Sequence, residues 1–100
     1  MRSRGQMRST LAEYPAVEEA LDGLGDEHGE LFVSTLEDFC DRYPDSAPLR
    51  RAAVRVSGSL AGWFLVTARG SRVWMVAAEG QAVEITEGLP RGFSGRRDQL

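Results

Sequence analysis

The chain has 100 residues, of which 42% are hydrophobic and 27% are charged, and its formal net charge is −3. These values lie near the averages for globular domains and exclude a fibrous protein or a chain disordered throughout. The apolar runs are short and none follows the N-terminal MRSRGQMRST, so we expect no signal peptide and no membrane-spanning segment. The sequence therefore predicts one small cytoplasmic domain.

The basic residues are all arginine, and lysine and asparagine are absent. Because those two residues use AT-rich codons, this bias indicates a bacterial or phage gene from a GC-rich genome, not a binding chemistry. Cys40 is the single cysteine, which excludes an internal disulfide and fits a reducing compartment.

The first part of the chain is predicted to hold a leader and a helix. Residues 1–9 are polar and lack periodicity, so we expect a disordered leader. In TLAEYPAVEEALDGLG, either Thr10 and Glu13 form a capping box or Pro15 occupies the first helical turn. Apolar residues recur at helical spacing, and the helix is predicted to stop at Gly23 or Gly25.

A second helix is predicted from Asp26 to Tyr43. Asp26 is a suitable N-cap, acidic residues follow in the first turn, and Pro44 ends the helix. An apolar stripe runs along it. The two helices would form a hairpin with acidic outer faces, and such a hairpin needs a further layer against which to bury its apolar stripes.

Residues 52–86 contain four β-rich runs separated by Ser57-Gly58-Ser59, Gly70-Ser71 and Glu79-Gly80-Gln81. We therefore predict an α+β fold in which an N-terminal helical hairpin packs on one face of a four-stranded antiparallel β-meander. The domain would span residues 10–87, and residues 88–100 would form a flexible basic tail.

The turns set the predicted faces of this sheet. A two-residue turn at Gly70-Ser71 places Trp63 and Arg69 on the same side as Arg72 and Trp74. The aliphatic residues, including Val83 and Ile85 beyond a left-handed Gly80, would then face the helices. A slip of one residue in either turn would reverse this assignment. The predicted partner-binding set on the open face is Arg55, Trp63, Arg69, Arg72 and Trp74, residue types enriched at interface hot spots. The alternative is that the chain's own segments bury both indoles.

Catalytic and metal-binding motifs are not found. His28 is the only histidine and lies among acids, so the chain cannot build a His-based triad or a Cys/His metal cluster. Cys40 lies on the predicted apolar stripe, as an inert core thiol would. We therefore expect no cofactor and no metal, and the sequence favours a protein that is not an enzyme.

Charge is divided unevenly along the chain. Residues 1–49 hold four arginines and eleven acids, a net charge of −7, whereas residues 50–100 hold eight arginines and four acids, a net charge of +4. This asymmetry indicates either an acidic partner for the second part or attraction between the two parts within the fold. A nucleic-acid partner is disfavoured by the negative net charge.

The order of an acidic helical pair, a GW dipeptide, the strand GSRVWMV and a final VEIT strand resembles the RelE/ParE/HigB toxins of bacterial toxin–antitoxin systems. In that family a helical pair backs a curved antiparallel sheet. Arg72, Val73 and Trp74 are similar to the family's Gly-x-Arg-Val-aromatic strand, and Trp63 to its Gly-Leu-Trp position. The chain departs from the pattern in being acidic and lysine-free and in lacking a predicted first strand. The resemblance implies a toxin acting on RNA, translation or gyrase.

Three functions follow from these patterns. The first is a small non-enzymatic binding or regulatory module whose Trp/Arg sheet face engages a partner chain or a second copy of itself. The second is the toxin implied by the resemblance. The third is a phage-encoded inhibitor whose acidic helices mimic nucleic acid and bind a basic host protein.

Overall fold

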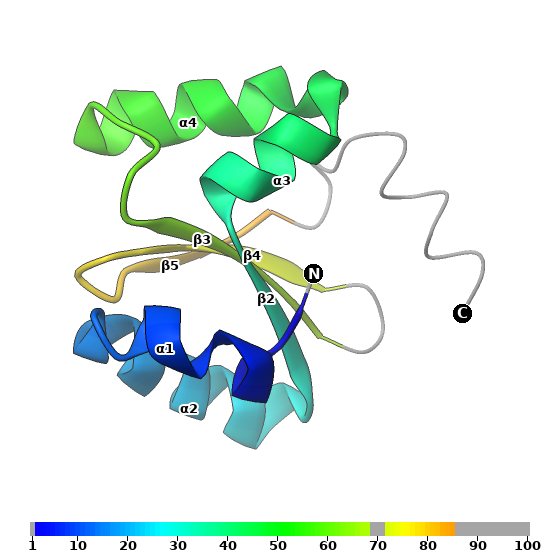
Figure 1. The fold of residues 1–100 in the computed structure, drawn as a ribbon, viewed down its shortest axis with the longest axis vertical. Helices are drawn as coiled ribbons and strands as arrows, with labels where there is room; N and C mark the ends of the chain where they lie inside the picture. Colours follow the sequence, from blue (N-terminus) through cyan, green and yellow to red (C-terminus); the bar gives the residue numbers. More distant parts are fainter. Residues whose placement is uncertain (1, 69–71, 86–100) are drawn as a thin grey trace.

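The computed structural model describes residues 2–68 and 72–85, which form an α+β fold. One antiparallel sheet has the strand order β1-β2-β3-β4-β5. Helices cover both of its faces, with α1 and α2 on one side and α3 and α4 on the other (Figure 1). The elements are, in chain order, β1 (Arg2–Ser3), the 3-10 helix η1 (Arg4–Met7), α1 (Arg8–Leu11), α2 (Pro15–His28), β2 (Leu31–Thr35), α3 (Leu36–Arg42), the 3-10 helix η2 (Pro44–Ser46), α4 (Ala47–Ser57), β3 (Trp63–Ala68), β4 (Val73–Ala77) and β5 (Ala82–Glu84).

Two core clusters, one on each face of the sheet, account for this three-layer arrangement. The first core cluster joins the sheet to α1 and α2 and consists of Met7, Leu11, Val17, Leu21, Leu31, Val33, Phe64, Val66, Ala68, Trp74 and Val76. The second core cluster joins the sheet to α3 and α4 and consists of Leu36, Phe39, Cys40, Leu49, Ala53, Trp63, Leu65, Val73, Met75 and Ala77. The predicted sheet with a single covered face is therefore wrong.

The central strands explain why both faces are covered. Five of the six residues of β3 and all five of β4 are buried, so neither strand alternates between apolar and exposed positions. Strands with near-continuous apolar sequences are buried on both faces. A single helical layer would leave half of these side chains in water.

Helix α2 begins as predicted, with Pro15 in its first turn. It continues past Gly23 and Gly25 to His28, beyond the predicted end. Neither glycine adopts a positive φ, whereas Gly29, directly after the helix, has a φ of 82°. The positive-φ glycine that ends this helix is therefore Gly29.

The predicted single helix over residues 26–43 is wrong. Gly29 ends α2, residues 31–35 form β2, and only residues 36–42 form a second helix, α3. In β2, Leu31 and Val33 are buried while Phe32 between them is exposed, the two-residue period of a strand. Pairing of β2 with β3 along its whole length overrides the apolar spacing that suggested one long helix.

The predicted first strand of the meander, around Val54 and Val56, is also wrong, because this segment lies in α4. Pro48 occupies the first helical turn, the interior is rich in alanine and arginine, and Gly58 supplies a left-handed C-cap with a φ of 81°. The alternation of two valines in AAVRVS suggested a strand, but helix-forming neighbours and both end signals determine the structure.

The register of β3 against β4 differs from the prediction by one residue. The backbone N–H of Ala68 donates to the carbonyl of Arg72 over 3.0 Å, and Val66 lies opposite Trp74. Three residues thus separate the paired ends, where a two-residue turn at Gly70-Ser71 was expected. Because the side-chain period of a strand is two, this shift moves every side chain of one strand to the other face.

The next turn keeps the predicted face of β5 but not the predicted loop. The backbone N–H of Ala77 donates to the carbonyl of Gln81 over 2.8 Å, so the three-residue loop is residues 78–80 and not 79–81, and the pairing is displaced by two residues. Gly80 adopts a φ of 94°, and Val83 lies opposite Met75, so β5 presents Val83 on the face expected from the loop. The backbone of Ile85 extends this pairing by donating to the carbonyl of Val73.

Residues 2–9, which the sequence predicts as a disordered leader, lie in β1, η1 and the first residues of α1. β1 pairs with β2, placing Arg2 opposite Val33. Met7 is buried in the first core cluster, which gives this segment an apolar anchor. The predicted tail, residues 88–100, lies outside the described residues.

Candidate functional site

Trp63 lies in the second core cluster, below α4, with 3% of its surface exposed. Its indole N–H donates to the hydroxyl of Ser57 over 2.7 Å. Ser57 is the last residue of α4, and its Oγ also lies 3.1 Å from the carbonyl of Ala53. The one polar group of the indole is therefore satisfied inside the molecule, as a buried tryptophan requires.

Trp74 lies on the opposite face of the sheet, in the first core cluster, and is 5% exposed. The His28 ring at the end of α2 packs against it, with ring centroids 4.9 Å apart. The guanidinium carbon of Arg72 lies 5.7 Å from the indole centroid, within cation–π range. The two indoles therefore do not form the common sheet face that the predicted register required.

Arg72 lies just before β4 and forms a bidentate ion pair with Glu84 of β5. Its Nε donates to Glu84 Oε2 over 3.1 Å and its Nη2 to Oε1 over 2.7 Å. The hydrogen bonds and then the charge of Glu84 raise the pKa of Arg72 above its ordinary value. Arg72 thus lies beside Trp74 at the edge of the first core cluster, and Glu84 of the neighbouring strand neutralises its charge.

The two remaining predicted site residues are Arg55 and Arg69. Arg55 lies on α4 and is exposed. Arg69 lies outside the described residues. Of the predicted set, the structure brings Arg72 and Trp74 together and places Trp63 below the helix that carries Arg55.

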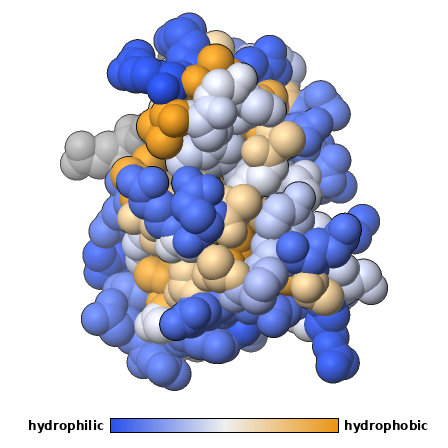
Figure 2. Space-filling model, turned by 90° about the vertical axis from the view of Figure 1, so that its left-hand side faces the viewer, coloured by the Kyte–Doolittle hydropathy of each residue, from blue (hydrophilic) through white to orange (hydrophobic). Residues whose placement is uncertain are grey.

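The outward side of α4 combines apolar and basic side chains. Val54 and Val56 are 45% and 60% exposed, the two highest values among the exposed large apolar residues of the described chain. The α4 surface is defined here as Arg50, Arg51, Val54, Arg55 and Val56. Figure 2 views the molecule from the C-terminal end of α4 and shows hydrophobic patches set among hydrophilic side chains in its upper part.

Spacing along α4 places Val54 in one patch with Arg50 and Arg51, whereas Val56, two residues after Val54, lies on another side of the helix. Arg50 and Arg51 lie one turn before Val54, at the three- and four-residue separations that place helical side chains side by side. Among the described residues, none of the three arginines of α4 forms an ion pair, in contrast to Arg72. The helix contains no acidic residue.

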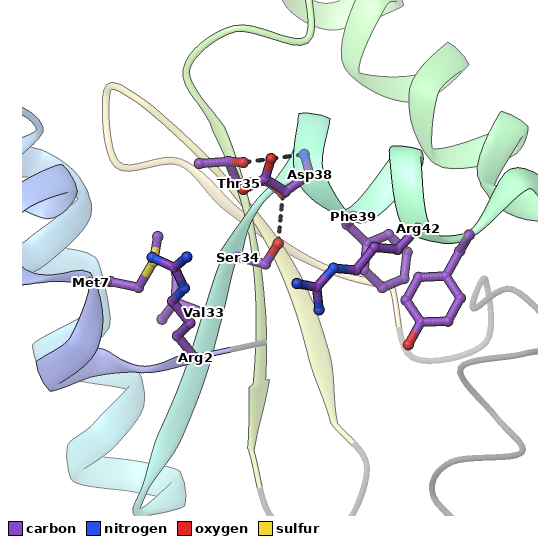
Figure 3. Close-up of a pocket in the computed structure, with 9 residues that line it drawn as sticks. Arg2, Met7, Val33, Ser34, Thr35, Asp38, Phe39 and Arg42 are labelled. Carbon is purple, nitrogen blue, oxygen red and sulfur yellow. Dashed lines mark hydrogen bonds between the residues drawn. The ribbon is translucent and has the colours of Figure 1, made fainter.

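A pocket of about 150 Å³ lies at the opposite margin of the sheet, where β1 and η1 approach the junction of β2 and α3. Figure 3 shows the guanidinium groups of Arg2 and Arg42 on two sides of it. Its lining consists of Arg2, Met7, Val33, Ser34, Thr35, Asp38, Phe39, Arg42 and Tyr43. Met7 and Val33 belong to the first core cluster and Phe39 to the second, so the pocket spans the seam between the two helical layers.

Sequence reasoning missed Arg2, Arg42, Arg50 and Arg51 as candidate site residues. The arginine-rich, alanine-rich composition of residues 50–55 was a signal for a basic helix. Arg2 and Arg42 are 40 positions apart, and only the pairing of β1 with β2 brings them to one pocket.

The described residues contain no group of three or more His, Cys, Asp or Glu side chains placed to hold a metal ion. Cys40 is a buried free thiol in the second core cluster. No helix in the described ranges is long and apolar enough to cross a membrane. Comparison with protein-family models, curated proteins and solved structures finds no match for this chain.

Proposed function

We propose that this protein is a small interaction module that binds an acidic segment of a partner protein through the α4 surface. The observation that carries the proposal is the combination, on one helix, of two exposed valines with three arginines that make no ion pair among the described residues. Trp63 and Trp74, predicted as contact residues, act instead as core residues of the two helical layers.

The apolar part of this surface favours a protein partner. Burying an exposed valine in an interface releases free energy in proportion to the apolar area removed from water, about 25 cal/mol per Å². Val54 and Val56 expose much of their surface although each lies beside an arginine, and isolated phosphate groups offer no apolar area to cover them. A nucleic-acid backbone is therefore a poorer fit than a polypeptide.

The arginines of the α4 surface favour a partner with negatively charged side chains. Arg50, Arg51 and Arg55 present planar guanidinium groups, which bind carboxylates through paired hydrogen bonds. The helix offers no acid of its own to compete. An acidic segment with apolar side chains between its carboxylates would match the surface in both respects.

The test compares two charge reversals of equal size on opposite layers of the molecule. Arg51→Glu changes the α4 surface, and Arg8→Glu makes the same change at an exposed position of α1, beyond the sheet. The full chain, carrying each change or Val54→Asn, serves as bait for proteins of the host cell, and circular dichroism checks that each variant folds.

A partner that uses the α4 surface binds the wild type and Arg8→Glu equally, and loses at least tenfold in affinity with Arg51→Glu and with Val54→Asn. Its affinity also falls with salt, because exposed charges are screened. Retention of all partners by Arg51→Glu and Val54→Asn, or the absence of any partner, refutes the proposal. Light scattering during size-exclusion chromatography shows whether the partner is a second copy of the chain.

The toxin hypothesis makes a separate prediction. Expression of a RelE-like toxin arrests growth, and a small antitoxin gene lies beside the toxin gene. Normal growth on expression, with no such neighbour, removes this hypothesis without affecting the proposed role of α4.

A further inference from the structure

We propose a second binding site, independent of the α4 surface: the pocket between β1 and α3 binds a phosphate group between Arg2 and Arg42. The two guanidinium groups reach the pocket from different elements, Arg2 from β1 and Arg42 from the last turn of α3 (Figure 3). Neither of them forms an ion pair with another described residue.

The absence of an ion pair is informative because an acid lies in the same pocket. Asp38 is four residues before Arg42 on α3, a separation at which opposite charges commonly pair. No such pair forms, and Asp38 contributes its backbone N–H to the Thr35 hydroxyl over 3.2 Å. Both arginines are exposed, so their guanidinium N–H groups face water and are accessible to a ligand, and with Asp38 they give the pocket a formal charge of +1.

The arginines are the charged donors among the residues that line this pocket. The Ser34 hydroxyl lies on the lining but is directed to the carbonyl of Thr35 over 2.8 Å. The free N–H groups of a guanidinium are acidic donors in a rigid plane and form short, strong hydrogen bonds to oxyanions. A ligand with several negatively charged oxygens is therefore the one that the lining recognises.

The position of the two arginines favours phosphate over carboxylate. A carboxylate carries a single negative charge and presents its acceptor sites in one plane, so it suits donors in that plane better than two guanidinium groups on different sides. A phosphate monoester carries a charge of about −1.5 to −2 and three acceptor oxygens directed apart. It can bind both guanidinium groups at once and still tolerate Asp38.

The size of the pocket limits the ligand to the phosphate group itself. The volume of the pocket is about 150 Å³. Pockets for drug-sized ligands are larger, about 300 to 1,000 Å³. The site therefore fits inorganic phosphate or the phosphate of a phosphorylated side chain, and does not enclose a nucleotide.

The test is a titration of the ¹⁵N-labelled full chain with inorganic phosphate, O-phosphoserine and acetate at constant ionic strength. Phosphate is expected to cause saturable shifts of the side-chain Nε–H signals of Arg2 and Arg42, while acetate causes weak, linear ones. Tighter binding of O-phosphoserine than of inorganic phosphate indicates a phosphorylated side chain as the source, and the reverse indicates the free ion.

Variants distinguish a specific phosphate-binding site from nonspecific attraction of anions to exposed arginines. Arg42→Gln and Arg2→Gln should each weaken phosphate binding at least tenfold, whereas Arg51→Gln on α4, with the same charge change, should leave it unchanged. Asp38→Asn should tighten binding, because it removes the one negative charge of the pocket. Linear shifts, equal loss in Arg51→Gln, or weaker binding in Asp38→Asn refutes the proposal.

Discussion

Replacing Trp63 tests whether the β3 indole belongs to the core. In the structure its ring is enclosed by the second core cluster and its N–H donates to Ser57. Replacement of a buried tryptophan by alanine typically costs about 3–5 kcal/mol, through lost transfer free energy and the cavity that remains. A domain of this size is stable by about 5–15 kcal/mol, so Trp63→Ala removes a large part of its stability.

Trp63→Phe is the milder variant and keeps the experiment informative if Trp63→Ala does not fold. Phenylalanine retains most of the apolar contact but loses the hydrogen bond, which is worth about 0.5–1.5 kcal/mol. The Ser57 oxygen keeps the carbonyls of Ala53 and Ser59 within reach, so it is not left unpaired. With the smaller ring included, we expect a loss of about 1–3 kcal/mol.

The assay is urea unfolding followed by far-ultraviolet circular dichroism, which does not depend on the indole that is replaced. Arg55→Ala, on the exposed side of α4, is the control and should change stability by less than about 0.5 kcal/mol. If Trp63→Ala also stays within that limit, the indole lies at the surface and the packing of α4 on the sheet is wrong.

Three further predictions follow from individual positions. Gly80→Ala should destabilise the protein by about 1–3 kcal/mol, because the new Cβ would lie 2.9 Å from the Ala16 carbonyl oxygen at a positive φ. Gly23→Ala, with open space around it in α2, should stabilise the protein by about 0.5–1 kcal/mol. In urea unfolding, an unchanged or higher stability of Gly80→Ala, or a lower stability of Gly23→Ala, would contradict the corresponding prediction. The Cys40 thiol should react with a disulfide reagent only as fast as the protein unfolds, and rapid reaction in native buffer would show that it is exposed. Arg72→Gln should lower the melting temperature less at 1 M salt than at low salt, since its ion pair with β5 is exposed and screened; an effect independent of salt would indicate a packing role.

The sequence predicts the elements whose signals are local and mutually consistent. Pro15 and the acidic, apolar periodicity after it correctly start α2. The aromatic and β-branched runs after residue 63 correctly predict β3 and β4, and the glycine at position 80 marks the turn to β5. The α+β class follows from these elements alone.

The errors arise where one local pattern fits two structures. Residues 31–35 have apolar residues at both helical and strand spacing, and only pairing with β3 selects the strand. Residues 47–57 contain alternating valines within a helix-forming composition. A sheet with one open face requires strands in which apolar and polar residues alternate. The sequences of β3 and β4 are instead almost continuously apolar, the pattern of strands buried on both faces.

The candidate sites could be predicted only in part. Arg55 was identified as a site residue and is exposed on α4, although a strand was expected there. The pocket could not be predicted, because it depends on a two-residue strand, β1, that places Arg2 opposite Val33. A pairing this short carries no periodicity in the sequence.

The register of β3 against β4 decides which face each tryptophan occupies, and nuclear Overhauser effects between α-protons measure it directly. Because Ala68 and Arg72 form a hydrogen-bonded pair, Leu65 and Met75 form a non-hydrogen-bonded pair with close α-protons. We expect a strong cross-peak between the α-protons of Leu65 and Met75. A strong cross-peak between the α-protons of Val66 and Met75 instead would show the register displaced by one residue, with Trp63 and Trp74 on one face of the sheet.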